Sequence, residues 1–130
     1  MIASNYIYNI LSLLCDGDDA GMATSLQLPY LTEEEYLYTA SGLFVSFKHL
    51  DGISEYKFQA DYNVVNGVKV KSSTPHLEAE AQFFLKDGLI DYLEIWCYDG
   101  DYPKEELTSY VLTQEWMGSP GKTISYNANE

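Results

Sequence analysis

The stretch Leu77–Tyr98, LEAEAQFFLKDGLIDYLEIWCY, carries the strongest structural signal in the chain. An Asp-Gly pair at Asp87-Gly88 separates two hydrophobic runs. A two-residue type I′ turn needs a positive φ at both of its central residues, and Asp-Gly pairs tolerate that conformation well. The stretch therefore predicts a β-hairpin whose loop is Asp87-Gly88 and whose first pair is Lys86 with Leu89.

The alternation of side chains along a strand predicts which residues of this hairpin share a face. Uninterrupted pairing places five facing pairs on one side: Leu85/Ile90, Phe83/Tyr92, Ala81/Glu94, Ala79/Trp96 and Leu77/Tyr98. The other side then carries Glu78, Glu80, Gln82, Phe84 and Lys86 against Leu89, Asp91, Leu93, Ile95 and Cys97. Because neither side is purely polar, we expect the hairpin to be central in a sheet and covered on much of both sides.

The N-terminal part of the chain predicts helix. Residues 5–15 carry apolar side chains at helical spacing, and Ser4 precedes them as a candidate N-cap. Residues 20–31 fit a short helix ended by Pro29. A capping-box pattern makes residues 33–38 fit a turn of helix, but their tyrosines fit a strand equally well.

Beyond residue 42 the sequence predicts strands. Residues 43–49 form one strand, and residues 55–62 alternate between apolar and polar side chains as a one-sided strand does. Asn66-Gly67 predicts a second hairpin between residues 64–65 and 68–71. Residues 104–116 fit a helix or a last strand, and the tail, residues 118–130, is expected to fray.

These elements predict an α+β fold: an N-terminal helix packed on a single antiparallel β-meander of five to six strands. A chain of 130 residues is expected to form one domain, residues 1–130, with a sizeable core. Cys15 and Cys97 lie far apart in the sequence, so we expect reduced, buried thiols. No basic leader is evident at the N-terminus, and we expect a cytoplasmic protein.

The charge of the chain restricts its partners. Twenty acidic residues against seven basic ones give a net charge of −13. Such a chain repels nucleic acid and anionic membranes, so neither is an expected partner. The acidity favours either simple solubility or a basic protein partner. The two histidines, His49 and His76, have no metal-ligand spacing, and we expect neither metal nor cofactor.

One carboxylate interrupts an apolar pattern. In the uninterrupted register Glu94 lies among Tyr92, Trp96 and Tyr98, and a carboxylate among aromatic rings is a candidate general acid or base. Tyr92, Glu94 and Trp96 would then line a pocket. The alternatives are that this face opens to solvent near Glu94, or that a Lys or a Tyr hydroxyl satisfies the carboxylate.

Aromatic and acidic residues also gather at the far end of the same strand. Trp96, Asp99, Asp101 and Tyr102 fit a recognition surface for a basic protein, together with Glu78 and Glu80 on a sheet face. Aromatic side chains supply the anchoring contacts of interfaces, and acids steer a basic partner. The alternative is a folded turn that buries the Trp and Tyr in the core.

The segments GLFVSF (42–47) and KDGLIDYLEIWCYDGDYPKEELTSYVLTQ (86–114), with the size and acidity of the chain, resemble the small acidic immunity proteins of bacterial toxin–immunity systems. These systems include contact-dependent growth inhibition. The resemblance implies a non-enzymatic protein that binds a cognate toxin domain, often a basic nuclease, and blocks its active site or the approach of substrate.

A second resemblance is architectural. An N-terminal helix before a curved sheet, with the late hairpin FFLKDGLIDYLEIW, is similar to the cone-shaped NTF2-like domains. It implies small-ligand binding, isomerisation or dehydration in the cone, with Glu94 as the acid. The chain differs from that group in lacking its set of three N-terminal helices. A third hypothesis is an acidic structural protein that pairs through a sheet edge into a homodimer.

Overall fold

The computed structural model describes residues 1–17, 19–59, 63–116 and 119–128. These residues form an α+β fold with one antiparallel sheet of seven strands. The helical elements are α1 (Asn5–Leu14), α2 (Asp19–Thr24) and two 3₁₀ helices, η1 (Ser25–Tyr30) and η2 (Ile53–Tyr56). The strands are β1 (Leu31–Thr39), β2 (Gly42–His49), β3 (Val64–Ser73), β4 (His76–Lys86), β5 (Leu89–Gly100), β6 (Ser109–Trp116) and β7 (Ser119–Asn127).

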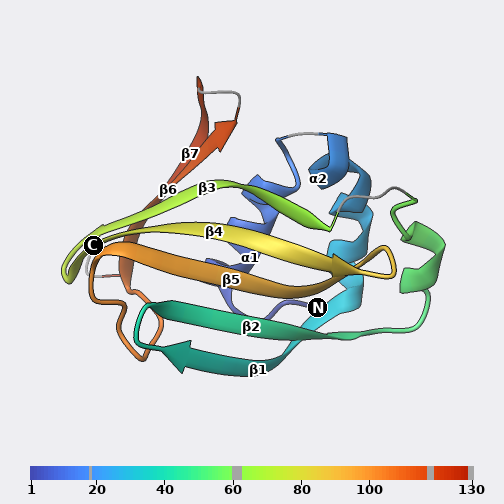
Figure 1. The fold of residues 1–130 in the computed structure, drawn as a ribbon, viewed down its shortest axis with the longest axis horizontal. Helices are drawn as coiled ribbons and strands as arrows, with labels where there is room; N and C mark the ends of the chain where they lie inside the picture. The colour runs from blue at the N-terminus through green and yellow to red at the C-terminus, as the bar shows by residue number, and fades with distance from the viewer. Residues whose placement is uncertain (18, 60–62, 117–118, 129–130) are drawn as a thin grey trace.

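The sheet has the order β1-β2-β5-β4-β3-β6-β7 (Figure 1). It combines a β1–β2 hairpin, a β3–β4–β5 meander and a β6–β7 hairpin. The predicted class and the antiparallel sheet are confirmed, whereas a simple meander of five to six strands is wrong. The meander is interrupted because β2 pairs with β5 and β6 pairs with β3.

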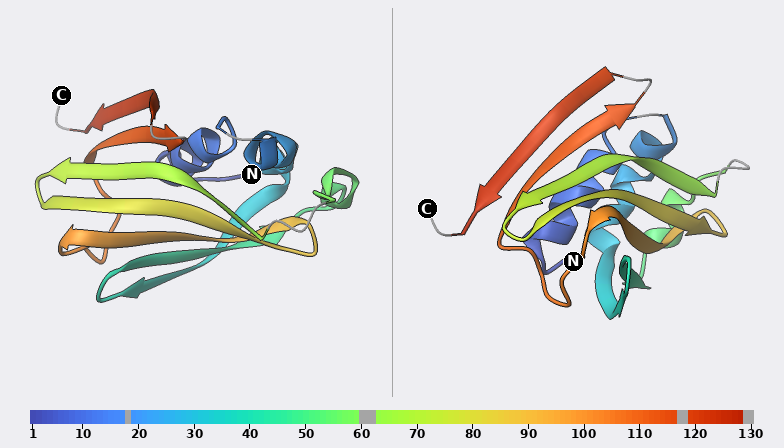
Figure 2. Two further views of the ribbon diagram at one scale, coloured as in Figure 1. Left: turned by 45° about the horizontal axis from the view of Figure 1, so that its top comes forward. Right: turned by 60° about the vertical axis from the view of Figure 1, so that its left-hand side comes forward.

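The helices cover one face of this sheet (Figure 2). Helix α1 packs on β3, β4 and β6, and six of its ten residues are buried. The predicted N-cap is confirmed, because the Ser4 hydroxyl accepts a hydrogen bond of 3.1 Å from the Ile7 N–H. A Ser in this position satisfies a backbone N–H that would otherwise lack a partner at the helix start.

The turn of the β4–β5 hairpin is confirmed. Asp87 and Gly88 have φ values of 53° and 78°, as a type I′ turn requires, and Lys86 pairs with Leu89. Beyond the Leu85–Ile90 pair the predicted register is wrong, because Asp91 is an extra residue in β5 with no opposite residue in β4. The pairs that follow are Phe84/Tyr92, Phe83/Leu93, Gln82/Glu94, Ala81/Ile95, Glu80/Trp96 and Ala79/Cys97.

This β-bulge exchanges the two faces of β5. Ile90 and Leu93 are both fully buried although they are three residues apart, so strict alternation fails between them. Leu93 and Ile95 thereby join the apolar β4 residues under the helices, and Tyr92, Glu94 and Trp96 lie on the other face. The hairpin is therefore covered by helices on one side and open on the other, contrary to the expected two-sided cover.

Three further predictions for the β region and the tail need correction. Asn66-Gly67 is a bulge inside a continuous β3, with Gly67 at φ 115°, and forms no hairpin. The predicted strand 55–62 begins instead with the 3₁₀ helix η2, and residues 60–62 lie outside the described residues. Within the tail expected to fray, the described residues Ser119–Asn127 pair with β6 as strand β7, where Ile124 faces Leu112.

The ambiguous segments are resolved toward strands. Residues 33–38 belong to β1, and the second half of 104–116 forms β6. Residues 20–31 hold two short helices in succession, and Pro29 lies inside the second of them, η1. The 3₁₀ helix tolerates Pro29 there because only Tyr30 follows it in the helix.

Two buried glutamines connect the helices to the sheet. Gln27 is fully buried; its amide donates to the carbonyls of Tyr56 and Gly88, both at 2.9 Å, and its Oε1 accepts from the Ile90 N–H at 2.8 Å. Gln114 donates to the Leu13 carbonyl at 2.8 Å, at the C-terminal end of α1. Each satisfies backbone groups that would otherwise be buried without partners.

A carboxylate from β1 holds the start of α1. Glu33 accepts hydrogen bonds from the N–H groups of Ala3 at 2.8 Å and Ser4 at 2.9 Å. Burial alone would raise the pKa of Glu33, but these backbone bonds outweigh it and hold the pKa below the usual value for a glutamate. The negative charge also lies at the positive end of the helix dipole.

We predict that Glu33→Gln lowers the free energy of unfolding by about 1 kcal/mol at pH 7, a typical magnitude for an anion at a helix start. The folded-state pKa lies below the unfolded one, so the carboxylate stabilises the fold above its unfolded pKa and loses this effect as the pH falls through the folded pKa. Urea unfolding of both proteins at pH 7 and about pH 3 measures this. The difference is expected to shrink at low pH.

The matched control for this prediction is Glu34→Gln, because Glu34 is the exposed neighbour of Glu33 on β1. It should change stability by less than about 0.5 kcal/mol at either pH. A Glu33→Gln difference that is equal at both pH values would contradict the role of the ionised carboxylate.

Candidate functional site

The face of the sheet that points away from α1 is the candidate functional site, and we call it the open face. Its side chains come from β2, β5, β4, β3 and β6, and all are at least partly exposed. The register places on it Phe44, Lys69, Lys71, Glu78, Glu80, Gln82, Phe84, Tyr92, Glu94, Trp96, Tyr98 and Glu115. It therefore combines aromatic rings with charged groups.

The aromatic side chains of the open face form two groups. Phe84 and Tyr92 stack with their ring centroids 4.6 Å apart, and Phe44 lies 6.0 Å from Tyr92 on the other side. Further along β5, the rings of Trp96 and Tyr98 lie 5.8 Å apart. Trp96 is 49% exposed and Tyr98 40%, so two adjacent large rings present an aromatic patch to solvent on this face.

Carboxylates outnumber amines on this face. Lys71 pairs with Glu78 at 3.3 Å, and Lys69 pairs with Glu115 at 3.4 Å. The hydrogen bond to Glu115, and its charge, raise the pKa of Lys69. Glu94 accepts a hydrogen bond of 2.7 Å from the Gln82 amide. Four glutamates thus face two lysines, which leaves a surplus of two negative charges.

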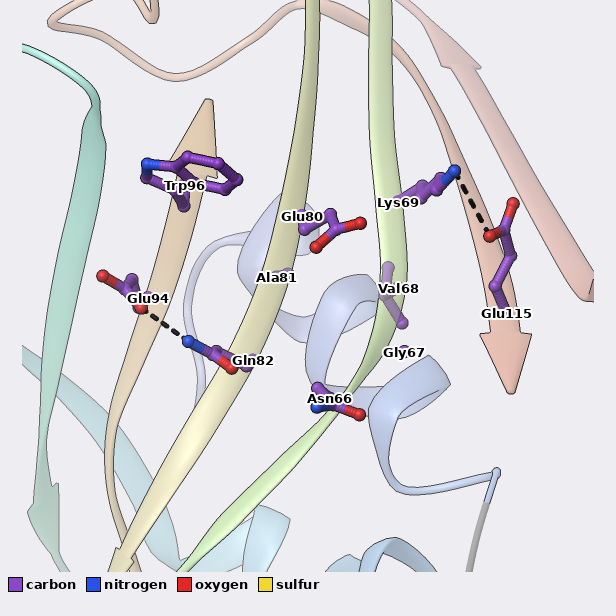
Figure 3. Close-up of a pocket in the computed structure, with 10 residues that line it drawn as sticks. All are labelled: Asn66, Gly67, Val68, Lys69, Glu80, Ala81, Gln82, Glu94, Trp96 and Glu115. Atoms are coloured by element: carbon purple, nitrogen blue, oxygen red, sulfur yellow. Dashed lines mark hydrogen bonds and ion pairs between the residues drawn. The ribbon is translucent and has the colours of Figure 1, made fainter. Parts of the chain in front are cut away.

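Between these groups the open face is hollowed, as Figure 3 shows. This main hollow has a volume of about 400 Å³ and lies over β5, β4, β3 and β6. Its lining comprises Asn66, Gly67, Val68, Lys69, Glu80, Ala81, Gln82, Glu94, Trp96 and Glu115. A second hollow of about 260 Å³ lies over β1, β2 and β5, lined by Glu35, Leu37, Phe44, Ser46, Asp91 and Tyr92.

The structure brings together three of the residues predicted to bind a partner. Glu78, Glu80 and Trp96 lie on the open face, and Glu80 is directly opposite Trp96 across β4 and β5. Asp99 and Asp101 are exposed near the C-terminal end of β5, where Asp99 lies 3.4 Å from the His76 ring. These two acids border the open face at its end.

Tyr102 belongs to the core. It is only 6% exposed, and its hydroxyl forms a hydrogen bond of 2.7 Å with the hydroxyl of Tyr6 on α1. Burial raises the pKa of Tyr102 well above the usual value for a tyrosine. Its side chain is therefore not available as a surface anchor, in line with the alternative that this turn buries part of its aromatic content.

The three residues of the alternative pocket are separated. Glu94 and Trp96 line the main hollow, whereas Tyr92 lines the second one. Of the two alternatives for Glu94, a face that opens to solvent agrees with its partial exposure, whereas the group that satisfies the carboxylate is the Gln82 amide and not a Lys or a Tyr hydroxyl. The hollow that Glu94 lines is open and lies on the face of the sheet opposite α1. Glu94 therefore does not lie in a cavity enclosed between helix and sheet.

Sequence reasoning missed Gln82, Phe84, Lys69 and Glu115 as members of this site. Gln82 and Phe84 meet Glu94 and Tyr92 only because of the bulge at Asp91, and Lys69 meets Glu115 because β6 lies beside β3. The sequence does contain a signal for the bulge. Leu93 comes three residues after Ile90, and Ile95 comes two residues after Leu93. Only a bulge puts all of them on one face.

Other classes of site find no support within the described residues. No group of three or more His, Cys, Asp or Glu side chains there is arranged to hold a metal ion. No described helix combines the length and the apolar character that crossing a bilayer takes. Comparison of the chain with protein-family models, with curated proteins and with solved structures gives no significant match. The function is therefore argued from the open face itself.

We predict very different stability costs for two aromatic residues that an uninterrupted register would place on one face. Phe83→Ala should lower the free energy of unfolding by about 3–5 kcal/mol, because Phe83 is fully buried. Trp96→Ala should cost less than about 1 kcal/mol, because half of the indole is already in water. Urea unfolding measures both values, and equal costs would contradict the bulged register.

Proposed function

We propose that this chain is a non-enzymatic binding protein that acts in the cytoplasm and neutralises a basic bacterial toxin domain, in the manner of immunity proteins. The open face would cover the active site of the toxin or the path of its substrate. The observation that carries the proposal is the exposure of Trp96 and Tyr98 on a sheet face with surplus carboxylates. Exposed aromatic rings beside acids are typical of interface anchors.

The charge of the whole chain supports the same partner class. A net charge of −13 accelerates encounter with a basic protein at low salt and disfavours acidic competitors. Asp99 and Asp101, at the border of the open face, would act through this steering more than through buried contacts. Glu78 and Glu80 would pair with Lys or Arg of the partner, and Trp96 would anchor it.

A small-ligand function is the second candidate, and the volume of the main hollow favours it. About 400 Å³ lies within the range of ligand sites, and Glu94 and Trp96 contribute to its lining. This candidate predicts a small molecule whose binding is lost on Glu94→Gln. The surplus of carboxylates and the open shape favour the basic protein partner over it.

The test is co-expression of the tagged protein with the product of the adjacent gene, followed by capture and mass spectrometry at low and high salt. A stoichiometric basic domain whose binding weakens with salt is the expected result. The double variant Glu80→Gln/Trp96→Ala should then raise the Kd at least 10-fold, because anchors dominate interface energies.

The matched control is Glu55→Gln/Tyr8→Ala, which removes one charge and one exposed aromatic ring away from the open face. It should leave the Kd within about twofold, since rim and remote substitutions contribute little. Capture of no basic protein, or equal Kd values for the two double variants, would contradict the proposed function.

A further inference from the structure

We propose that the main hollow receives the guanidinium group of an arginine side chain of the partner, between Trp96 and Glu80. This inference rests on the proposed function and specifies the group that the open face recognises. The lining of the hollow carries three carboxylates and one amine, which is a net charge of −2. A cationic group is therefore the occupant that its charge fits.

Among the carboxylates that line the hollow, Glu80 is the one that accepts no hydrogen bond and forms no ion pair within the described residues, although its charge adds to the raised pKa of Lys69. Lys69 lies opposite Glu80 in the β3–β4 register, but its amine pairs with Glu115 on the far side, as Figure 3 shows. Glu80 makes no hydrogen bond or ion pair with any described residue. An arriving cation would supply the missing partner at little desolvation cost, because the Glu80 side chain is exposed.

The indole of Trp96 supplies the second contact. Glu80 and Trp96 face each other directly across β4 and β5, so their Cβ atoms lie roughly 5 Å apart. Trp96 lines the hollow, and Figure 3 shows its indole lying across β5 with the six-membered ring extending toward Glu80. A cation between them meets a carboxylate and the face of a Trp ring, the aromatic side chain that attracts cations most strongly.

Glu94 adds negative charge at the border of the hollow. Its Oε1 accepts the hydrogen bond from the Gln82 amide, which holds the carboxylate in place. Glu94 and Trp96 are two residues apart on β5 and lie on the same face. Figure 3 shows the other Glu94 oxygen on the side of β5 away from Glu80, so Glu94 attracts a cation beside Trp96 and Glu80 through its charge.

These contacts favour arginine over lysine. A guanidinium is planar, so it stacks on an indole while its edge donates two N–H groups to one carboxylate, and it is less strongly hydrated than an ammonium. An ammonium is a compact point charge that cannot stack on the indole and make the paired hydrogen bonds to a carboxylate together. The volume of about 400 Å³ also leaves space for the aliphatic stem of the arginine.

The experiment is an NMR titration of the ¹⁵N-labelled protein with three uncharged-backbone probes: N-acetyl-arginine amide, N-acetyl-lysine amide and N-acetyl-citrulline amide. The arginine probe should give saturable shifts of the Trp96 indole N–H and of the β4 and β5 amides around Glu80 and Glu94. A Kd on the order of millimolar is expected for one side chain. Citrulline, which has the shape without the charge, should not saturate.

Variants locate the binding and separate it from general attraction to an acidic protein. Glu80→Gln and Trp96→Leu should each raise the Kd for the arginine probe at least fivefold. Glu55→Gln has the same net charge as Glu80→Gln but changes an exposed residue of η2, and it should leave the Kd unchanged. Unchanged thermal unfolding of each variant confirms that its fold is intact.

Equal affinity for the lysine and arginine probes, or an equal effect of Glu80→Gln and Glu55→Gln, would overturn the guanidinium site. Failure of this inference is distinct from failure of the proposed function. If a basic partner still loses binding to the Glu80→Gln/Trp96→Ala variant while the arginine probe does not saturate, the open face binds the partner without a guanidinium hollow. If the probe saturates and no basic partner is found, the proposed function fails alone.

Discussion

The extra residue at Asp91 is the constraint on which the rest of the structure depends. Without it, strict alternation would place Leu93 and Ile95 on the open face and would bury Glu94 under the helices. Each buried aliphatic side chain stabilises the fold by about 1.5–3 kcal/mol, whereas an unpaired buried carboxylate costs several. One unpaired residue in the ladder is a small penalty beside that difference, so burial of the aliphatic residues selects the bulged pairing.

The same bulge produces the candidate site. Once the aliphatic side chains of β5 point toward α1, the remaining residues, Tyr92, Glu94 and Trp96, can only point outward. They meet the polar alternate residues of β4, among them Glu80 and Gln82, whose sequence neighbours Ala79 and Ala81 point to the other face and are buried. An acidic and aromatic open face is therefore a direct consequence of how the core is filled, and the proposed partner binding would use a surface that folding already generates.

Long-range polar contacts hold the helical layer on the other face. Gln27 connects η1 to η2 and to the β4–β5 turn, Gln114 connects β6 to the end of α1, and Glu33 connects β1 to its start. Both ends of α1, and the region where η1 meets η2, are therefore held by polar contacts as well as by apolar packing. The open face keeps its shape because the opposite face is anchored at several points.

The local signals in the sequence were sufficient for α1, its Ser4 cap, the Asp87-Gly88 turn and β2. They were insufficient for features that depend on partners distant in the sequence. Asn66-Gly67 has the chemistry of a turn, but pairing of the whole of β3 with β4 makes it a bulge. The tail has the composition of a frayed end, but β6 offers it a strand to pair with. The same limit applies to the candidate site. Residue type is enough to identify Glu78, Glu80 and Trp96 as surface residues of the site. It is not enough for Tyr102, which is buried against Tyr6 of α1, a residue distant in the sequence.

The most direct test of the account is the accessibility of two adjacent positions on β5. Leu93→Cys and Glu94→Cys are each treated with a small alkylating reagent under native conditions, and the unsubstituted chain gives the background. That background should be slow, because Cys15 and Cys97 are buried and burial raises the pKa of the Cys97 thiol. The bulged register predicts that the thiol at position 94 reacts at least about 100-fold faster than the thiol at 93, which needs an opening of the structure to react. Faster reaction at position 93 would contradict the register, and with it the open face.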